Sequence, residues 1–173
     1  MNPGANKKHL TILEMVLFGM LAALTFALQV VMGPLPNIEP VSLLVMLFAV
    51  TFGWKCLYPV YIFVVMEILY YGINVWNIYY LYVWTVLAVA AILLRNAKSS
   101  VIWAVLSAIF GLLFGALCGI VDVFIGGFSY ALAKWASGIL FDVTHCVGNF
   151  VIALVLFAPL RKLMGKLYGK VKR

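Results

Sequence analysis

The sequence predicts an all-α integral membrane protein, a single domain over residues 1–173 with six transmembrane helices and both termini in the cytoplasm. The first supporting observation is composition: 66% of the residues are hydrophobic and 10% are charged, whereas about 25% are charged in a typical soluble domain. The second is that the apolar residues form runs long enough to cross about 30 Å of hydrocarbon. The third is that Lys and Arg lie at the ends of these runs, as in cytoplasmic loops.

The first predicted span is residues 12–32, an apolar run of 21 residues. It exceeds the apolar part of a signal peptide and further spans follow it, so we interpret it as a retained first helix. The proline-rich residues 33–40 cannot be helical throughout and form a loop, which we expect to gate a site by hinging near Gly33. The second span, 41–54, is short, and its length alone would favour a re-entrant segment.

The middle and last thirds of the chain allow more than one division. The 39 residues 56–94 contain neither Lys nor Arg, and this length predicts two spans with a break around 72–77. The 60 residues 101–160 hold a single Lys. They could form three spans, or two spans joined by a connector at 126–137.

The distribution of basic residues decides between these divisions. With six spans and a cytoplasmic N-terminus, eleven of the twelve Lys and Arg lie inside and only Lys134 lies outside. Losing the short second span, or adding a seventh, would move the basic C-terminal tail outside, against the positive-inside rule. The approximate predicted spans are therefore 12–32, 41–54, 56–72, 78–94, 101–125 and 138–160.

Several functional classes are disfavoured by the same sequence. The net charge of +7 arises from cations that flank apolar runs, which is a membrane pattern rather than a nucleic-acid-binding one. Cys56, Cys118 and Cys146 show no pairing pattern and are interpreted as small packing residues. No hydrolase, metalloprotease or phosphate-loop motif occurs, and Asp142 with His145 supplies only two metal ligands. We therefore expect no enzyme activity, no ATPase motif, no cofactor and no metal.

Polar residues inside the predicted spans gather toward the outer side of the membrane, where four of the five acids lie. Placing an ionisable group inside a span costs about 2.5–3.5 kcal/mol of insertion free energy, so each such group is expected to have a structural or functional role. Aromatic residues such as Trp76 and Tyr80 gather there too. The fifth acid, Glu14, is expected to snorkel at the inner face beside Lys7 and Lys8. The candidate substrate-binding residues are Asn37, Glu39, Glu67, Asn77, Trp84, Asp122, Trp135, Asp142, His145 and Asn149.

Three of these candidates, Asp142, His145 and Asn149, are spaced i, i+3, i+7 and should share one face of the sixth helix. A simpler interpretation remains open for each kind of residue. The Trp and Tyr residues could form an interfacial belt, His145 could be an interior hydrogen-bonding residue, and Asp142 could favour a helix dipole. Their joint placement on one side of the membrane favours a pocket that opens to the outside.

Small residues form two ladders at helical spacing, which allow helices to approach closely in a membrane. For the ladder on the fifth helix, packing within the chain is the favoured interpretation. The ladder on the first helix could instead face another protein. The first-helix ladder is Gly19, Ala23 and Ala27, and the fifth-helix ladder is Ala104, Ala108, Gly111, Gly115 and Gly119.

The chain resembles the substrate-binding S component of an energy-coupling factor (ECF) vitamin transporter, including the cobalamin-specific kind. The likeness rests on six spans with both ends cytoplasmic, the Ala23-x-x-x-Ala27 pair, and the segments LPNIEPVSLL at 35–44 and FDVTHCVGNF at 141–150. It implies a multi-pass protein of the bacterial cell membrane that binds one micronutrient from outside, in an outer pocket lined by helices four to six. It also implies docking through the first helix to a transmembrane coupling subunit with two ATPases, as part of an ABC importer.

The predicted substrate is neutral or cationic, because four acids oppose Lys134 alone on the outer side. The aromatic residues favour a flat or conjugated ligand. The resemblance makes cobalamin the first guess, with thiamin, pyridoxine or a queuosine precursor as alternatives. A different class, a proton-coupled secondary transporter using Glu67 or Asp122, is the main rival, and a structural or assembly protein is the third possibility.

Overall fold

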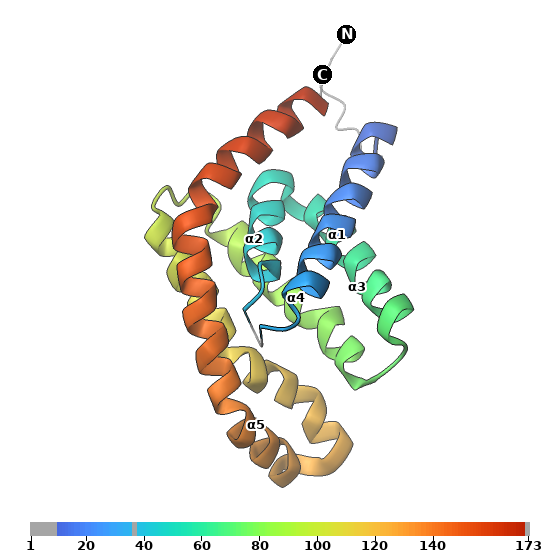
Figure 1. The fold of residues 1–173 in the computed structure, drawn as a ribbon, viewed down its shortest axis with the longest axis vertical. Helices are drawn as coiled ribbons and strands as arrows, with labels where there is room; N and C mark the ends of the chain where they lie inside the picture. Colours follow the sequence, from blue (N-terminus) through green and yellow to red (C-terminus); the bar gives the residue numbers. More distant parts are fainter. Residues whose placement is uncertain (1–9, 36–37, 172–173) are drawn as a thin grey trace.

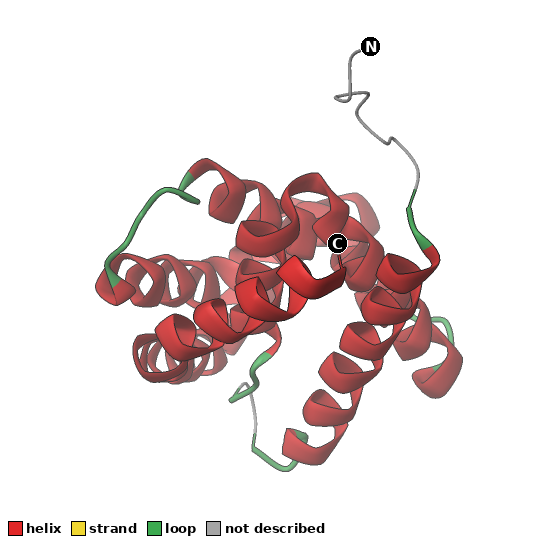
Figure 2. Cartoon of the chain, turned by 90° about the horizontal axis from the view of Figure 1, so that it is seen from above, coloured by secondary structure: helices red, strands yellow, loops and turns green. Residues whose placement is uncertain are grey.

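The computed structural model describes residues 10–35 and 38–171. All regular structure in this part of the chain is helical, so the all-α class is confirmed (Figures 1 and 2). The elements are α1 (Ile12–Met32), α2 (Val41–Phe52), the 3-10 turn η1 (Gly53–Cys56), α3 (Leu57–Tyr71), α4 (Val75–Leu93) and α5 (Ser100–Val171).

The long helix α5 consists of two arms that meet at one residue. Gly127 has φ 81° and ψ 174°, which is not helical. A side chain would make this positive φ costly, so glycine permits the sharp turn. The residues on either side of Gly127 stay helical, and the connector expected at 126–137 is therefore reduced to this one break. The first arm is 100–126 and the second is 128–171.

Contacts at the two ends of the molecule fit alternating directions for the six helical segments of the described residues. At one end, Glu14 at the start of α1 bonds both Lys55, between α2 and α3, and Tyr168, near the end of α5. At the other end, Gln29 near the end of α1 donates to Tyr80 near the start of α4. The start of α1 and the end of α5 therefore lie at the same end of the molecule (Figure 1).

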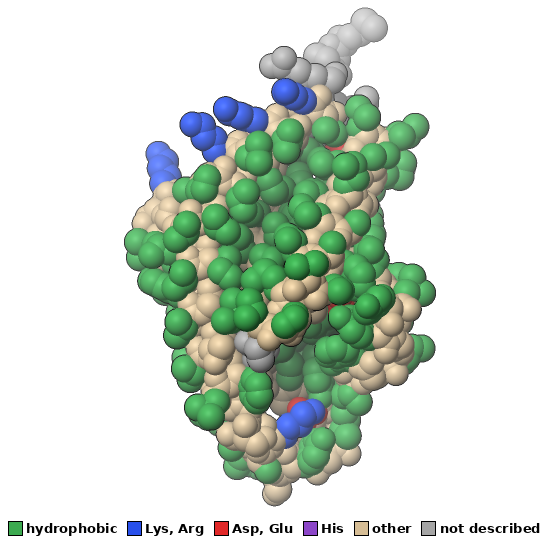
Figure 3. Space-filling view, viewed as in Figure 1, with side chains coloured by type: hydrophobic (Ala, Val, Ile, Leu, Met, Phe, Trp, Pro, Cys, Tyr) green, Lys and Arg blue, Asp and Glu red, His purple; other side chains and the backbone are tan. Residues whose placement is uncertain are grey.

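Charge differs between these ends. We call the end that holds Glu14 the basic end, because the described cations gather there, and the opposite end, which holds Lys134, the far end. Figure 3 shows blue side chains along the upper part of α5 and one blue group beside an acid near the bottom. The cations of the basic end are Lys55, Arg95, Lys98, Arg161, Lys162, Lys166 and Lys170.

The short helix α2 forms the centre of the bundle. Ten of its twelve residues are buried, and it packs against α1, α4 and α5. A helix that is apolar on all sides can be surrounded by other helices, with no face left for water. The shortness of the 41–54 segment, which on length alone suggested re-entry from the membrane surface, therefore reflects an interior position.

Four helical stretches in the described residues are long and apolar enough to cross a membrane: Ile12–Met32, Val41–Tyr71, Val75–Leu93 and Ser100–Val171. The second of these holds α2 and α3, and the fourth holds both arms of α5. Large apolar side chains are widely exposed on their outer faces, as the green surface in Figure 3 shows. Such a surface is unsuited to water and fits a multi-pass membrane protein.

Glu14 is the centre of a buried cluster at the basic end, in contrast to the snorkelling side chain expected from sequence. Its carboxylate accepts two bonds from Lys55 Nζ at 2.8 and 2.9 Å and one from the Tyr168 hydroxyl at 2.8 Å. It also completes a capping box with Thr11 at the start of α1. Lys7 and Lys8, its expected neighbours, lie outside the described residues.

We expect Glu14→Gln to lower the stability of the folded protein by about 1–3 kcal/mol, because the carboxylate charge that pairs with Lys55 and accepts from Tyr168 is lost. Thermal unfolding in detergent of Glu14→Gln, Lys55→Gln and the double variant measures the coupling. Lys162→Gln, an exposed change at the same end, is the control. Single effects that simply add in the double variant would contradict this role.

Candidate functional site

A cavity of about 310 Å³ lies at the far end. Every helix except α2 contributes to its wall, as does the loop before α2. Cavities of about 300–1,000 Å³ with a few polar groups are typical of small-molecule sites. The lining residues are Gln29, Met32, Gly33, Leu35 and Glu39 from α1 and its loop, Tyr71 from α3, Trp76 and Tyr80 from α4, and Phe114 and His145 from the two arms of α5.

A tight turn between α3 and α4 positions two of the cavity's aromatic rings. Gly72 ends α3 with φ 80°, a conformation that favours glycine. Asn77 accepts a bond from the Asn74 backbone N–H at 2.7 Å and so caps the start of α4. This brings the rings of Tyr71 and Trp76 to a centroid separation of 5.5 Å. Asn77, a predicted site residue, thus shapes the turn and is not among the lining residues.

Buried polar atoms around the cavity have no hydrogen-bond partner among residues 10–35 and 38–171. They are Gln29 Oε1, both carboxylate oxygens of Glu67 and both ring nitrogens of His145. Glu67 and His145 are only 1% and 2% exposed. Leaving a buried polar group without a partner costs about 1–3 kcal/mol. A bound ligand that paired with these groups would recover that free energy.

One carboxyl group lines the cavity, and a second lies near it on another element. Glu39, in the loop before α2, lines the cavity directly. Burial raises the pKa of the Glu39 carboxyl to about 7, and the nearby Glu67 carboxyl adds to the rise. Glu67, on α3, is also within electrostatic range of the hydroxyls of Tyr71 and Tyr80. Both acids were predicted from sequence as site residues, and the structure brings them together.

An aromatic cluster lies behind the cavity, centred on Trp84. Its ring is fully buried and lies 5.3 Å from Tyr80 and 5.9 Å from Phe114, centroid to centroid. Phe114 in turn lies 5.1 Å from the ring of His145. Trp84, also a predicted site residue, therefore supports the lining residues without itself lining the cavity.

Asp122 is part of a separate cluster at the far end. Its carboxylate accepts hydrogen bonds from the Tyr79 hydroxyl and from Lys134 Nζ, the latter at 2.8 Å. Lys134 also donates to Tyr79 at 2.9 Å. These contacts join α4 to both arms of α5. Asp122, predicted as a substrate-binding residue, has a lysine partner from elsewhere in the chain and is not among the lining residues.

The predicted stripe of the sixth helix does face the interior, because Asp142, His145 and Asn149 are all buried. Its members make different contacts. Asn149 Nδ2 donates to Ser42 Oγ at 3.1 Å and to the Ser107 carbonyl at 3.2 Å. Asp142 accepts from the Gly115 N–H at 3.0 Å. Of the three, only His145 lines the cavity.

The glycine ladder on α5 allows its two arms to touch. A Cβ at Gly111 would lie 2.8 Å from the backbone of His145, and one at Gly115 would collide with the Asp142 carboxylate. Packing within the chain, the interpretation favoured from sequence, is therefore confirmed for these two positions. The close approach at Gly111 places His145 against the cavity.

We expect Gly111→Ala to lower the stability of the folded protein by about 1–3 kcal/mol, because the added methyl group forces the arms apart. Gly119→Ala is the matched control, since a Cβ there meets nothing within 4 Å. Removing a helical glycine there should leave stability unchanged or raise it by up to about 1 kcal/mol. Thermal unfolding of both variants in detergent checks this, and equal losses would contradict the close contact.

The remaining predicted site residues have different positions. Asn37 lies outside the described residues. Trp135 is 37% exposed on the second arm of α5 and is not among the lining residues. Sequence reasoning did not select Gln29 or Phe114. Gln29 is the only glutamine in the chain and lies inside the first apolar run, which is a signal that could have identified it.

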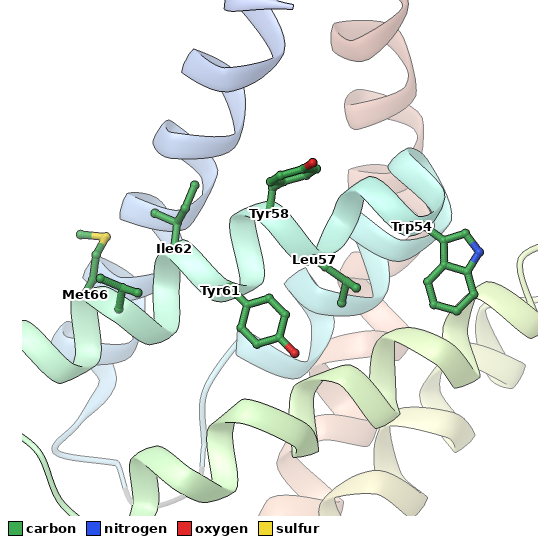
Figure 4. Close-up of a pocket in the computed structure, with 7 residues that line it drawn as sticks. Trp54, Leu57, Tyr58, Tyr61, Ile62 and Met66 are labelled. Carbon is green, nitrogen blue, oxygen red and sulfur yellow. The ribbon is translucent and has the colours of Figure 1, made fainter. Parts of the chain in front are cut away.

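A larger groove of about 530 Å³ runs along α3, and Figure 4 shows its lining side chains projecting from α3 and, for Trp54, from η1. Its lining is almost wholly apolar, from Trp54 to Met66. The Tyr61 hydroxyl is already bonded to the Leu81 carbonyl at 3.0 Å and to Thr85. With no unpaired buried polar group, this groove suits contact with lipid tails, and the cavity at the far end is the better candidate site.

The small-residue ladder of α1 points away from the bundle. Ala23 and Ala27 are exposed, and a Cβ at Gly19 would meet nothing within 4 Å. The opposite face of α1, with Phe18 and Ala22, packs inward. The ladder therefore has no partner within the described part of the chain.

Comparison with protein-family models, with curated proteins and with solved structures finds no match to this chain. Within the described residues, no group of three or more His, Cys, Asp or Glu side chains could hold a metal ion.

Proposed function

We propose that this chain is the substrate-binding S component of an ECF-type ABC importer in the bacterial cell membrane. It captures a vitamin or related micronutrient from outside the cell and delivers it through a coupling subunit and two ATPases. The observation that carries the proposal is the far-end cavity, where Gln29 Oε1, the nearby Glu67 carboxylate and the His145 ring nitrogens have no hydrogen-bond partner among the described residues. The chain itself does not hydrolyse ATP.

In this proposal the chain crosses the membrane six times, with both termini in the cytoplasm. The alternating direction of the six helical segments supports the crossings. The cations of the basic end support a cytoplasmic position for that end, by the positive-inside rule. The cavity, at the opposite end, then opens toward the outside (Figure 3).

The size of the cavity bears on the choice of substrate. At about 310 Å³, it lies at the lower limit of about 300–1,000 Å³ for small-molecule sites. This volume favours a compact ring compound such as thiamin, pyridoxine or a queuosine precursor. Cobalamin, the first guess from the resemblance, is a far larger molecule and would require the cavity to open.

The exposed ladder of Gly19, Ala23 and Ala27 supports docking to a coupling subunit. Small residues on an unpartnered helix face allow another helix to approach closely in lipid. The ladder lies along α1 and the cavity opens at its far end, so a partner could cover the ladder without blocking the cavity.

A proton-coupled secondary transporter is the second candidate, favoured by one observation. Glu67 is buried without a hydrogen-bond partner among the described residues and could carry a proton. Asp122, the other acid considered for that role, is held by Lys134 and Tyr79.

Purification of the tagged chain from its native membranes in mild detergent tests the proposal. An S component should bring down a transmembrane subunit and two ATPases, together with a small molecule identifiable by mass spectrometry. A chain that purifies alone, and that takes up substrate into liposomes on a proton gradient without ATP, would support the secondary transporter instead.

A further inference from the structure

Within residues 10–35 and 38–171, neither Glu39 nor the nearby Glu67 forms an ion pair with a Lys or Arg side chain. Glu39 lines the cavity, and the carboxyl of Glu67 is close enough to raise the pKa of Glu39. Lys134, the described cation of the far end, is bonded to Asp122. Two neighbouring acids in a buried site cannot both ionise without a compensating positive charge. That charge must come from protons or from a ligand.

Three neighbouring aromatic rings line the same cavity as Glu39. Tyr71, Trp76 and Tyr80 all line it, with Trp76 between the other two at centroid distances of 5.5 and 6.1 Å. The negative faces of such rings attract an organic cation, and Trp is the strongest partner. A neutral ligand would gain stacking from the rings but would leave the charge of the acids uncompensated.

Two further lining residues complete the site. Gln29 Oε1 and the His145 ring nitrogens are unpaired among residues 10–35 and 38–171, and both residues line the cavity. Both groups can form hydrogen bonds with a polar substituent of the ligand. Neither carries a fixed positive charge that would repel a cation. The cavity therefore combines acids, aromatic rings and neutral hydrogen-bonding groups.

We propose that the ligand of this cavity is a compact organic cation, with its positive charge held at the Glu39 carboxyl, near Glu67, and against the rings of Tyr71, Trp76 and Tyr80. This inference deepens the proposed function by naming the substrate class, and it rests on that function for its transport role. A permanently charged or protonated nitrogen in or beside a small ring satisfies the site.

Binding of a cation should release a proton in weakly acidic solution. The pKa of Glu39, raised from about 4.5 to about 7, must fall again when a positive charge is bound. Affinity should therefore rise with pH up to about 7 and level off above it, with a slope of at most about tenfold per pH unit. The titratable groups that face Glu39 are Glu67 and Tyr71 on α3, Tyr80 on α4 and His145 on α5.

The test uses two probes of the same shape, choline and its uncharged isostere 3,3-dimethylbutan-1-ol. The detergent-purified chain is freed of retained small molecules, and each probe is titrated at constant ionic strength while the melting temperature is followed. We expect choline to bind about tenfold or more tightly than the isostere at pH 7.5. The preference should shrink at pH 5.5.

Matched variants locate the effect. Glu67→Gln and Trp76→Leu should each lose most of the preference for choline. Asp122→Asn, a carboxyl-to-amide change outside the cavity, and Trp54→Leu, a tryptophan change in the groove along α3, should keep it. Comparing the two probes within each variant removes any general loss of stability from the result.

Equal effects of the two probes on the unaltered chain, or no effect of either, would overturn the cation inference. So would a preference that Glu67→Gln leaves intact. These failures do not affect the proposed function, which is tested separately by co-purification with the ATPases. Conversely, a chain that prefers choline but never associates with a coupling module would retain the cation site and lose the importer proposal.

Discussion

Replacing both Ala23 and Ala27 by Trp should abolish assembly with the coupling subunit, and with it transport, while ligand affinity changes by less than about twofold. Both methyl groups lie on the exposed face of α1. Indole rings there would hold a partner helix several ångströms away and remove the close contact that drives helix association in lipid. Co-purification with the ATPases measures assembly, and equilibrium binding measures affinity.

Two alanine positions serve as controls for bulk. Ala116→Trp places the same ring on an exposed face of α5, where assembly should survive. Ala22→Trp, one residue from the ladder, adds bulk to a fully buried site on the inward face of α1 and should impair folding instead. If the double variant still assembles and transports normally, α1 is not the docking helix.

Much of the helical arrangement could be predicted from sequence because apolar runs and breakers are local signals. The first predicted span, 12–32, has the bounds of α1, and α2 and α3 begin and end close to the expected residues. The break between the arms of α5 was placed too broadly. A positive φ at a single glycine can end one helix and start the next without a loop. In the sequence, the Gly126-Gly127 pair does not show which of the two residues adopts that conformation.

The site was predictable only in part because periodicity places a residue on a face but does not name its partner. Glu39, Glu67 and His145 were selected and do gather at the cavity. Asp122 and Asn149 are predicted for the same reason, namely the free-energy cost of exposing a polar side chain to lipid. Their partners come from distant parts of the chain, as with Asn149 and Ser42, 107 residues apart. Such pairings follow from the packing of helices, which one sequence does not specify.

The helix-six stripe provides the last test, because the structure divides its residues between two roles. His145 lines the cavity with both ring nitrogens unpaired among the described residues. His145→Ala should weaken binding of the co-purifying small molecule by roughly 5- to 150-fold, the equivalent of about 1–3 kcal/mol for a lost buried hydrogen bond. Membrane insertion and co-purification with the coupling subunit should survive.

Asn149→Ala should behave differently, because its amide joins α2 to both arms of α5 through Ser42 and the Ser107 carbonyl. Its main effect should be a lower melting temperature, with a smaller loss of affinity than in His145→Ala. Val147→Ala, on the exposed face of the same arm, is the control and should change neither quantity appreciably. Equilibrium binding and thermal unfolding of the three purified variants separate these roles. Unchanged affinity in His145→Ala would remove the imidazole from the ligand site and leave Gln29, Glu39, Glu67 and the aromatic rings as its determinants.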